Sequence, residues 1–275
     1  MYESFRRRVW NCIYPLILMM AVYLFVYLFA IVLYSAFFSS SGTGLEDFMS
    51  SNGNFISIAA LALGGLCMFF IYKRDIVIHS NFILKNPVWF IPVIAVGIFA
   101  AHGLSILVSF MNIDNIIGSY SDSVQSVFAY DAAVAFLKSA VLVPLCEEVL
   151  FRGVIYNRLK KYWGLWPAAL ISSALFGIYH LNLAQGLYAF IYAILLCLVY
   201  DCFRNLWVPV SMHAAANTVS LLLTYLNVSY PAIWIYVVAM TTTLAAAAVI
   251  YIFLIRKKKS DVEEDIAAAR AAAGF

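Results

Sequence analysis

Residues 133–153 read AVAFLKSAVLVPLCEEVLFRG, and this stretch places two adjacent carboxylates and an arginine directly after a long apolar run. A charged side chain at membrane depth costs several kcal/mol unless it is paired or hydrated. The stretch therefore predicts both a membrane-embedded helix and a specific use for Glu147, Glu148 and Arg152.

The composition extends this prediction to the whole chain. Of the 275 residues, 65% are hydrophobic and 11% are charged, and the mean hydropathy of +0.92 is far above that of soluble globular proteins. Apolar runs of about 20 residues, enough to cross the hydrocarbon core, recur along the sequence. We expect an all-α, polytopic membrane protein with about eight transmembrane helices and a buried polar catalytic cavity. The predicted spans are 10–38, 55–72, 88–112, 127–157, 167–182, 184–201, 206–227 and 231–255, the first of them too long for a cleavable signal.

The basic residues indicate how the chain is oriented. Lys and Arg residues precede the first span and follow the second, fourth, sixth and eighth. The intervening loops carry no Lys or Arg, and their charged residues are Glu46, Asp47, Asp114 and Asp122. Because short cytoplasmic loops collect Lys and Arg, this pattern predicts a multi-pass protein of the cell membrane, in contact with lipid, with both termini cytoplasmic. The net charge of +3 reflects this topology, and no nucleic-acid partner is expected.

Nearly the whole chain belongs to one membrane domain. The polar stretches SSSGTGLEDFMSSNGN and DNIIGSYSDSV are predicted to be external loops. We divide the chain into N-terminal helices of unassigned role at 1–125, a catalytic core at 126–227, and a last helix with a cytoplasmic tail at 228–275. The five cysteines show no paired C-x-x-C spacing, so we expect buried thiols.

Three polar residues of separate spans lie at similar depth. Counted from the basic surface at about 1.5 Å per residue, Glu147, His180 and His213 lie roughly 16, 21 and 13 Å into the membrane. Pro144 should bend the fourth helix and leave a backbone carbonyl unpaired near Glu147. We therefore predict one cavity that opens toward the cytoplasmic half.

Spacing by four residues puts further pairs of side chains on common helix faces. These pairs are Glu148 with Arg152, Phe176 with His180, and His213 with Asn217. A carboxylate, two imidazoles and a carboxamide at one depth supply a base, a proton shuttle and donors for an oxyanion. Taken singly, Glu148 and Arg152 are explained by an ion pair that locks helices, and either histidine by packing.

Other ionisable residues are assigned structural positions. His79 is expected at the surface of a cytoplasmic loop, and His102 is expected to pack within the third span. Asp131 and Lys138, in the outer half of the fourth helix, are expected at a loop edge or in pairs between helices.

With these motifs, the chain resembles the CPBP family of intramembrane proteases, also called the Abi or type II CAAX prenyl endopeptidase family. The motifs are Glu147-Glu148-x-x-x-Arg152, Phe176-x-x-x-His180 and His213-x-x-x-Asn217, within about residues 130 to 225. The resemblance implies hydrolysis of peptide bonds inside the membrane, with Glu147 and His180 activating water and His213 and Asn217 stabilising the oxyanion. It ranks Glu147 above Glu148 as the base and makes Glu148, Arg152 and Phe176 supporting residues.

The sequence leaves several alternatives open. Glu147, His180 and His213 also match a catalytic zinc set with one open position, although the resemblance favours no required metal. A non-catalytic membrane protein that binds peptides, such as an immunity or scaffold protein of the same family, is the alternative to an endopeptidase. A transporter is disfavoured because no internal repeat is found. The substrate would be a membrane-associated or lipid-anchored peptide, and whether it is prenylated is not decided, nor is the oligomeric state.

Overall fold

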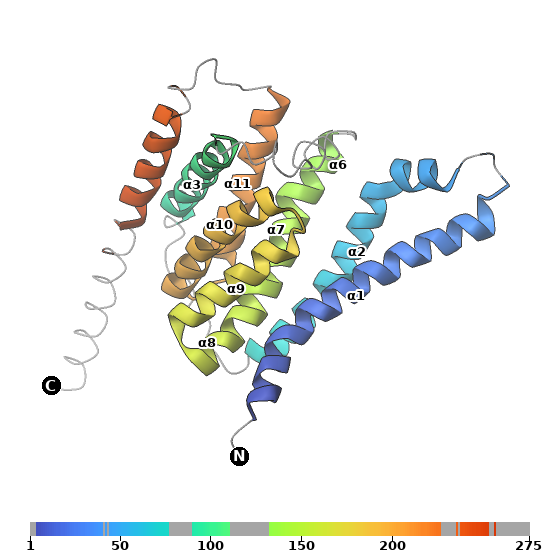
Figure 1. Ribbon diagram of the computed structural model, residues 1–275, viewed down its shortest axis with the longest axis horizontal. Helices are drawn as coiled ribbons and strands as arrows, with labels where there is room; N and C mark the ends of the chain where they lie inside the picture. The colour runs from blue at the N-terminus through green and yellow to red at the C-terminus, as the bar shows by residue number, and fades with distance from the viewer. Residues whose placement is uncertain are drawn as a thin grey trace.

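The computed structural model describes residues 4–40, 42, 44–76, 90–110, 132–226, 235, 237–252 and 256. All regular secondary structure in these ranges is helical, and Figure 1 shows the helices arranged as one bundle. The first three are α1 (Phe5–Phe37), α2 (Leu45–Ile76) and α3 (Phe90–Phe110). The fourth long helical segment, called the fourth rod, consists of α6 (Ala132–Phe136), η2 (Leu137–Leu142), α7 (Val143–Glu148), η3 (Val149–Tyr156) and α8 (Asn157–Trp163). The remaining helices are α9 (Leu165–Tyr179), α10 (Leu183–Phe203), α11 (Trp207–Tyr225) and Val237–Ile252.

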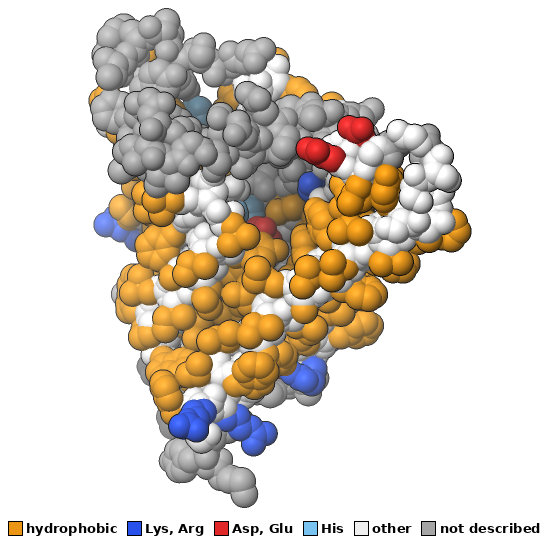
Figure 2. All heavy atoms as spheres, turned by 45° about the vertical axis from the view of Figure 1, so that its right-hand side comes forward, with side chains coloured by type: hydrophobic (Ala, Val, Ile, Leu, Met, Phe, Trp, Pro, Cys, Tyr) orange, Lys and Arg blue, Asp and Glu red, His pale blue; other side chains and the backbone are white. Residues whose placement is uncertain are grey.

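The outer surface of the bundle is suited to lipid. By length and composition, α1, α2, α3 and α10 could each cross a membrane, and α9 and Val237–Ile252 are shorter apolar helices. Figure 2 shows hydrophobic side chains across the middle of one face and Lys and Arg at its lower end. The prediction of an all-α, polytopic membrane protein is confirmed.

The predicted start of the second helix was wrong. The second helix begins at Leu45 rather than at residue 55, so most of the polar stretch expected as a loop is helical. Acidic Glu46 and Asp47 occupy its first turn, where they complement the positive end of the helix dipole. The Asn52 amide donates to the Phe48 carbonyl at 2.9 Å, so polar side chains here support the helix. The predicted external loop DNIIGSYSDSV and the tail after residue 256 lie outside the described residues.

The fourth rod contains wide helical turns on both sides of the acidic residues. Six residues of η2 precede α7 and eight residues of η3 follow it, both in π-helical conformation. Short π-helical segments within α-helices are frequently found at functional sites. In this rod they flank the segment that carries Glu147 and Glu148.

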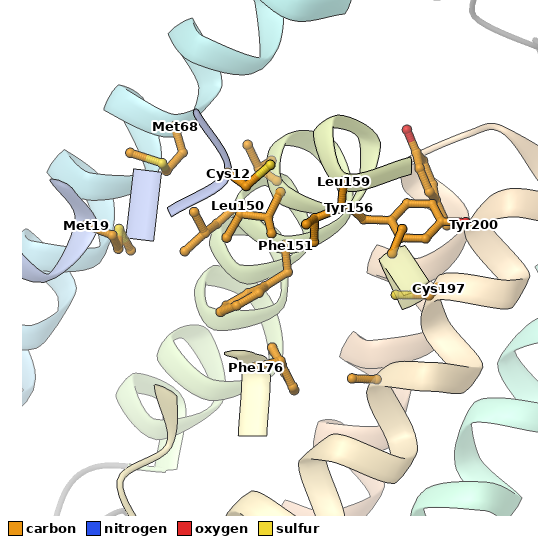
Figure 3. Packing of buried hydrophobic residues seen from close by; sticks show 14 of the residues in the cluster. Cys12, Met19, Met68, Leu150, Phe151, Tyr156, Leu159, Phe176, Cys197 and Tyr200 are labelled. Atoms are coloured by element: carbon orange, nitrogen blue, oxygen red, sulfur yellow. The ribbon is translucent and has the colours of Figure 1, made fainter. Parts of the chain in front are cut away.

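The core lies where α1, α2, η3, α8, α9 and α10 meet. Figure 3 shows the labelled residues packing against one another from these elements: Cys12, Met19, Met68, Leu150, Phe151, Tyr156, Leu159, Phe176, Cys197 and Tyr200. A second cluster joins α3, α10, α11 and Val237–Ile252, with Val96, Leu196, Met212 and Ala247 among its members. The five cysteines are free, and Cys12, Cys146 and Cys197 are buried as predicted. The three-part division of the chain stays a prediction. Helices from its first part pack directly on helices of its second part.

The end of the bundle that carries most of the basic residues is fixed by ion pairs. Arg158 in α8 donates to the Asp75 carboxylate at 2.6 Å and to the Tyr14 hydroxyl at 2.9 Å, joining α8 to α2 and α1. Asp201 of α10 pairs with Lys160 and lies 3.6 Å from Arg204. We call this the basic end, in contrast to the acidic end at Glu46.

A glycine brings α2 close to the acidic segment. A Cβ atom at Gly65 would overlap the Cys146 sulfur, and its next nearest neighbour would be Cys146 Cβ at 3.4 Å. The Cys146 thiol also lies 3.4 Å from the Leu61 carbonyl of α2. The absence of a side chain at Gly65 therefore allows α2 to lie against the residue that precedes Glu147.

We expect Gly65→Ala to destabilise the protein by about 1–3 kcal/mol, the usual cost of overpacking a filled core. Cys146→Ala in the same chain removes the overlapping sulfur and should recover most of the loss. Unfolding of the purified protein in mixed micelles, titrated with a denaturing detergent, measures both. Gly44→Ala is the control, because its nearest neighbour would be 3.5 Å away. A single variant as stable as the parent, or a double variant no better than the single, would contradict the packing described.

Candidate active site

Two neighbouring carboxylates of α7 face one imidazole of α11. His213 Nδ1 lies 2.8 Å from Glu148 Oε1, and its Nε2 lies 3.9 Å from Glu147 Oε2. The side chains of His213 and Glu147 are each 8% exposed, and that of Glu148 is fully buried. The structure thus brings together Glu147 and His213, which the sequence placed at one depth.

Arg152 is the second partner of Glu148. Its Nη1 donates to Glu148 Oε1 at 3.0 Å, with both side chains at 0% exposure, which confirms the predicted intramembrane ion pair. Its Nη2 donates to the Ala193 carbonyl of α10 at 3.2 Å, and its guanidinium lies 4.8 Å from the centre of the Phe176 ring. Arg152 therefore links η3, α9 and α10 around the carboxylate.

The remaining carboxylate oxygens are unusual because they are buried without hydrogen bonds. Glu147 Oε2 and Glu148 Oε2 have no hydrogen-bond partner among the described residues. Burying an acceptor without a donor is unfavourable, so such an atom in a native protein calls for an explanation such as a catalytic role or an unseen water. Glu148 makes its other contacts to Arg152 and His213 through Oε1. No hydrogen bond to Glu147 is found among the described residues, and His213 Nε2 lies 3.9 Å from its Oε2.

His180 lies at the end of α9, one residue beyond the last helical position, rather than inside a span that continues to residue 182. Its Nδ1 is 2.8 Å from the Phe176 carbonyl oxygen, which can only accept, so Nδ1 carries the proton. In the neutral ring, Nε2 then carries a lone pair. His180 and His213 both lie close enough to Glu147 to interact with it electrostatically.

The Phe176 ring separates the two histidines. Its centroid lies 4.8 Å from that of His180 and 6.0 Å from that of His213, both at steep interplanar angles. It is 2% exposed and also supports the Arg152 guanidinium. Phe176 therefore fixes three of the polar side chains by packing.

Asn217 occupies a position that follows from Pro144. In the π-helical turn, the Val143 amide donates to the Lys138 carbonyl, so the Ser139 carbonyl would receive the next amide, that of residue 144. Pro144 has no N–H. The Asn217 side-chain amide donates to the Ser139 carbonyl instead, at 2.8 Å. The predicted unpaired carbonyl is thus present, and Asn217 satisfies it.

The surface of the bundle has a hollow. Figure 2 shows an acidic side chain and a histidine deep in this hollow, between hydrophobic surfaces. On this face, the hollow lies in the half of the molecule that carries the acidic side chains, above the basic end. This face therefore differs from the sequence prediction of an opening toward the basic, cytoplasmic half.

Sequence reasoning missed three tyrosines near the site. Tyr23 of α1 hydrogen-bonds to Tyr179 of α9, and both interact electrostatically with Glu147. The Tyr192 hydroxyl donates to the Met212 carbonyl at 3.2 Å, and its ring centroid lies 6.2 Å from that of His213. Tyrosines are frequent in this sequence, so only their spacing within an assembled bundle could have singled these out.

The sequence assigned structural positions to four other ionisable residues: His79, His102, Asp131 and Lys138. Lys138 donates to the Asn54 side chain of α2 at 2.9 Å, which confirms the predicted pairing between helices. His102 is half-buried in α3. His79 and Asp131 lie outside the described residues.

A metal site was left open at Glu147, His180 and His213. Within the residues that the structure describes, no three His, Cys, Asp or Glu side chains are gathered closely enough to hold a metal ion. His213 Nδ1 is occupied by Glu148, which leaves Nε2 as the nitrogen that could act as a ligand. A chelator experiment below addresses metal dependence directly.

Comparison with known proteins locates the resemblance in this part of the chain. Residues 129–219 match the family model described as type II CAAX prenyl endopeptidase Rce1-like. The chain is 31% identical over 104 residues to "Putative membrane peptidase YdiL" of Bacillus subtilis, which is 37% of this chain and 43% of that protein. It is 36% identical over 98 residues to an "Uncharacterized 24.3 kDa protein" of Escherichia coli, which is 34% of this chain and 45% of that protein.

Both alignments cover less than half of the relative's length. No solved structure matches the chain. The matched segment contains all seven residues of the three motifs, from Glu147 to Asn217. Residues 129–219 are therefore similar to the Rce1-like, type II CAAX prenyl endopeptidase family.

Proposed function

We propose that the protein is an intramembrane endopeptidase that hydrolyses membrane-associated or lipid-anchored peptides with water activated by Glu147. One observation carries the proposal. A buried imidazole is held between two carboxylates: Glu148 is paired through Oε1 with Arg152 and His213, whereas no hydrogen bond to Glu147 is found among the described residues. A structural ion pair alone would leave no need for the second carboxylate.

Water is activated by Glu147 together with His180. In a low-dielectric pocket a carboxylate is a stronger base than in water, and Glu147 Oε2 has no competing donor among the described residues. His180 presents the Nε2 lone pair because Nδ1 is bound to a carbonyl, so it can accept the proton and pass it to the leaving amine. The water oxygen bonds to the carbonyl carbon as its proton moves to Glu147 or His180. The C–N bond of the tetrahedral intermediate then breaks as this proton passes to the leaving amine, which yields a carboxylic acid and a free amine.

The oxyanion is stabilised by His213 and Asn217. When the His213 ring carries a hydrogen on both nitrogens, Nδ1–H donates to Glu148 and Nε2–H is a donor for the oxyanion. Glu148 holds that ring through Nδ1. Asn217 uses one amide hydrogen for the Ser139 carbonyl and keeps a second for the oxyanion. The loss of one such donor typically slows a reaction by about 10²–10³.

The proposed setting is the cell membrane, with both termini cytoplasmic, because most of the described Lys and Arg residues outside the site, with Lys138 as an exception, cluster at one end of the bundle. The partners are lipid and a membrane-associated peptide. No metal is required in this mechanism, since water activation is assigned to a carboxylate and an imidazole. A peptide-binding protein without catalysis would use the same hollow but would not need Glu147.

We expect Glu147→Gln to lower cleavage by about 10²-fold or more, because it keeps size and hydrogen bonding while removing the base. The full chain, reconstituted in liposomes, is incubated with a mixture of synthetic peptides, and new termini are counted by mass spectrometry. This readout requires no substrate to be known in advance. A parallel arm with a chelator reports whether activity depends on a metal ion.

Glu46→Gln is the matched control, because Glu46 is exposed in the first turn of α2 and should leave cleavage unchanged. If Glu147→Gln retains full turnover, the carboxylate is not the base. If the parent chain retains peptides but cleaves none, the non-catalytic binding protein is the better account.

We expect Arg152→Ala to destabilise the fold by about 3–5 kcal/mol, because it leaves the Glu148 charge buried without its cation. Glu148→Gln with Arg152→Met removes both charges and should restore most of this stability. Cleavage by the double variant should nevertheless stay about tenfold or more below the parent, since the imidazolium loses its carboxylate. Detergent-induced unfolding and the peptide assay give the two readouts. A double variant that recovers activity along with stability would reduce Glu148 to a packing role.

A further inference from the structure

Two arginines at the basic end meet at one tyrosine. The Tyr14 hydroxyl of α1 accepts from Arg74 Nη2 of α2 and from Arg158 Nη2 of α8, each at 2.9 Å. Both arginines also pair with Asp75: Arg158 Nε lies 2.6 Å from Oδ2, and Arg74 Nε lies 3.4 Å from Oδ1. No other carboxylate of the described residues pairs with either arginine. One carboxylate thus serves two guanidinium groups, which leaves the cluster with an excess positive charge.

The two arginines differ in what they leave accessible. The Arg158 side chain is 12% exposed, and its three nitrogens donate to Asp75, to Tyr14 and to the Asn11 carbonyl. The Arg74 side chain is 66% exposed, and its bonds to described residues come from Nε and Nη2. A guanidinium is suited to phosphate because its planar donors match the phosphate oxygens. Arg74 therefore keeps donors for an anion from outside the protein, whereas Arg158 is used within it.

The surroundings of this cluster place it at the level of lipid headgroups. The exposed Trp10 ring lies with its centroid 6.2 Å from that of Tyr14, and Trp and Tyr are enriched where hydrocarbon meets water. Further along α1, the exposed side chains are apolar, beginning with Ile17 and Leu18. Arg74 lies in the last turn of α2, and Figure 2 shows Lys and Arg side chains below the hydrophobic surface. Phosphate groups of lipids are concentrated at this level.

We propose that Arg74, supported by Tyr14 and Arg158, forms a binding site for the phosphate of an anionic phospholipid, and that the bound headgroup fastens α1 and α2 to α8. A headgroup with a net negative charge offsets the excess positive charge of the two arginines. Phosphatidylcholine offsets it less well, because its own cation accompanies the phosphate. The Tyr14 hydroxyl already joins α2 to α8 through the two arginines, so neutralising their repulsion strengthens the contacts among all three helices. The proposal does not depend on peptide hydrolysis.

The test places the full chain in nanodiscs of phosphatidylcholine, with or without phosphatidylglycerol, and follows thermal unfolding by tryptophan fluorescence. Phosphatidylglycerol should raise the apparent melting temperature of the parent by about 2–4 °C. Arg74→Gln should lose most of this rise. In phosphatidylcholine alone it should melt close to the parent, because an exposed ion pair contributes little. Arg204→Gln is the matched control: it removes the same charge from the same end, where Arg204 is exposed and lies 3.6 Å from Asp201, and it should keep the rise.

An equal loss of the rise in both variants would indicate diffuse attraction between the basic end and the membrane surface, and it would overturn a site at Arg74. A rise of the same size when inorganic phosphate is added to phosphatidylcholine nanodiscs would assign the site to free phosphate and overturn the lipid. Native mass spectrometry provides a readout that is independent of stability. The parent and Arg204→Gln should retain phosphatidylglycerol through purification in detergent, whereas Arg74→Gln should lose it. Equal retention by Arg74→Gln and the parent also contradicts the proposal.

Discussion

Glu148 has a fully buried carboxylate, and the helices around it are arranged so that its charge is balanced. One oxygen receives hydrogen bonds from the guanidinium of Arg152 and from the imidazole of His213. Because Arg152 also reaches the Ala193 carbonyl and the Phe176 ring, the charge of one residue fixes α7, α9, α10 and α11 relative to one another. Replacing a buried ion pair with apolar residues is often neutral or stabilising, so such a group is better explained by function than by stability. The neighbouring Glu147 is thereby held in a fixed position, while its Oε2 has no hydrogen-bond partner among the described residues.

Much of the fold could be predicted from the sequence, because the bilayer restricts what a hydrophobic chain can do. The lengths of the apolar runs predicted the helices, and the spacing of four residues predicted that Glu148 and Arg152 form a pair. The beginning of α2 was missed because a hydropathy argument treats Ser, Asn and Gly as loop residues. In the structure Asn52 binds the preceding helical turn, so local hydrogen bonds outweigh composition.

The geometry of the site was less accessible to sequence reasoning. Counting residues along regular helices predicted that Glu147 and His213 lie at a similar depth. Which carboxylate contacts which imidazole nitrogen depends, however, on how each helix is rotated about its own axis. The π-helical turns of η2 and η3 change that rotation, and no simple residue pattern announces them. Pro144 gave a partial signal: its missing N–H predicted a free carbonyl, although not that Asn217 would occupy it. Tyr23 could not have been found, since its relevance depends on how α1 packs in three dimensions.

The shortness of α9 has a consequence for the membrane itself. Its 15 residues extend about 22 Å, whereas the hydrocarbon core is about 30 Å thick. A hydrophobic helix shorter than the core is accommodated by local thinning of the bilayer. His180 lies at the end of this helix, followed by Leu181, which has a φ of 54° and is 81% exposed. We therefore expect the bilayer to thin next to the site and the interface to be drawn toward His180, so that water and a peptide from the membrane surface could reach the same depth.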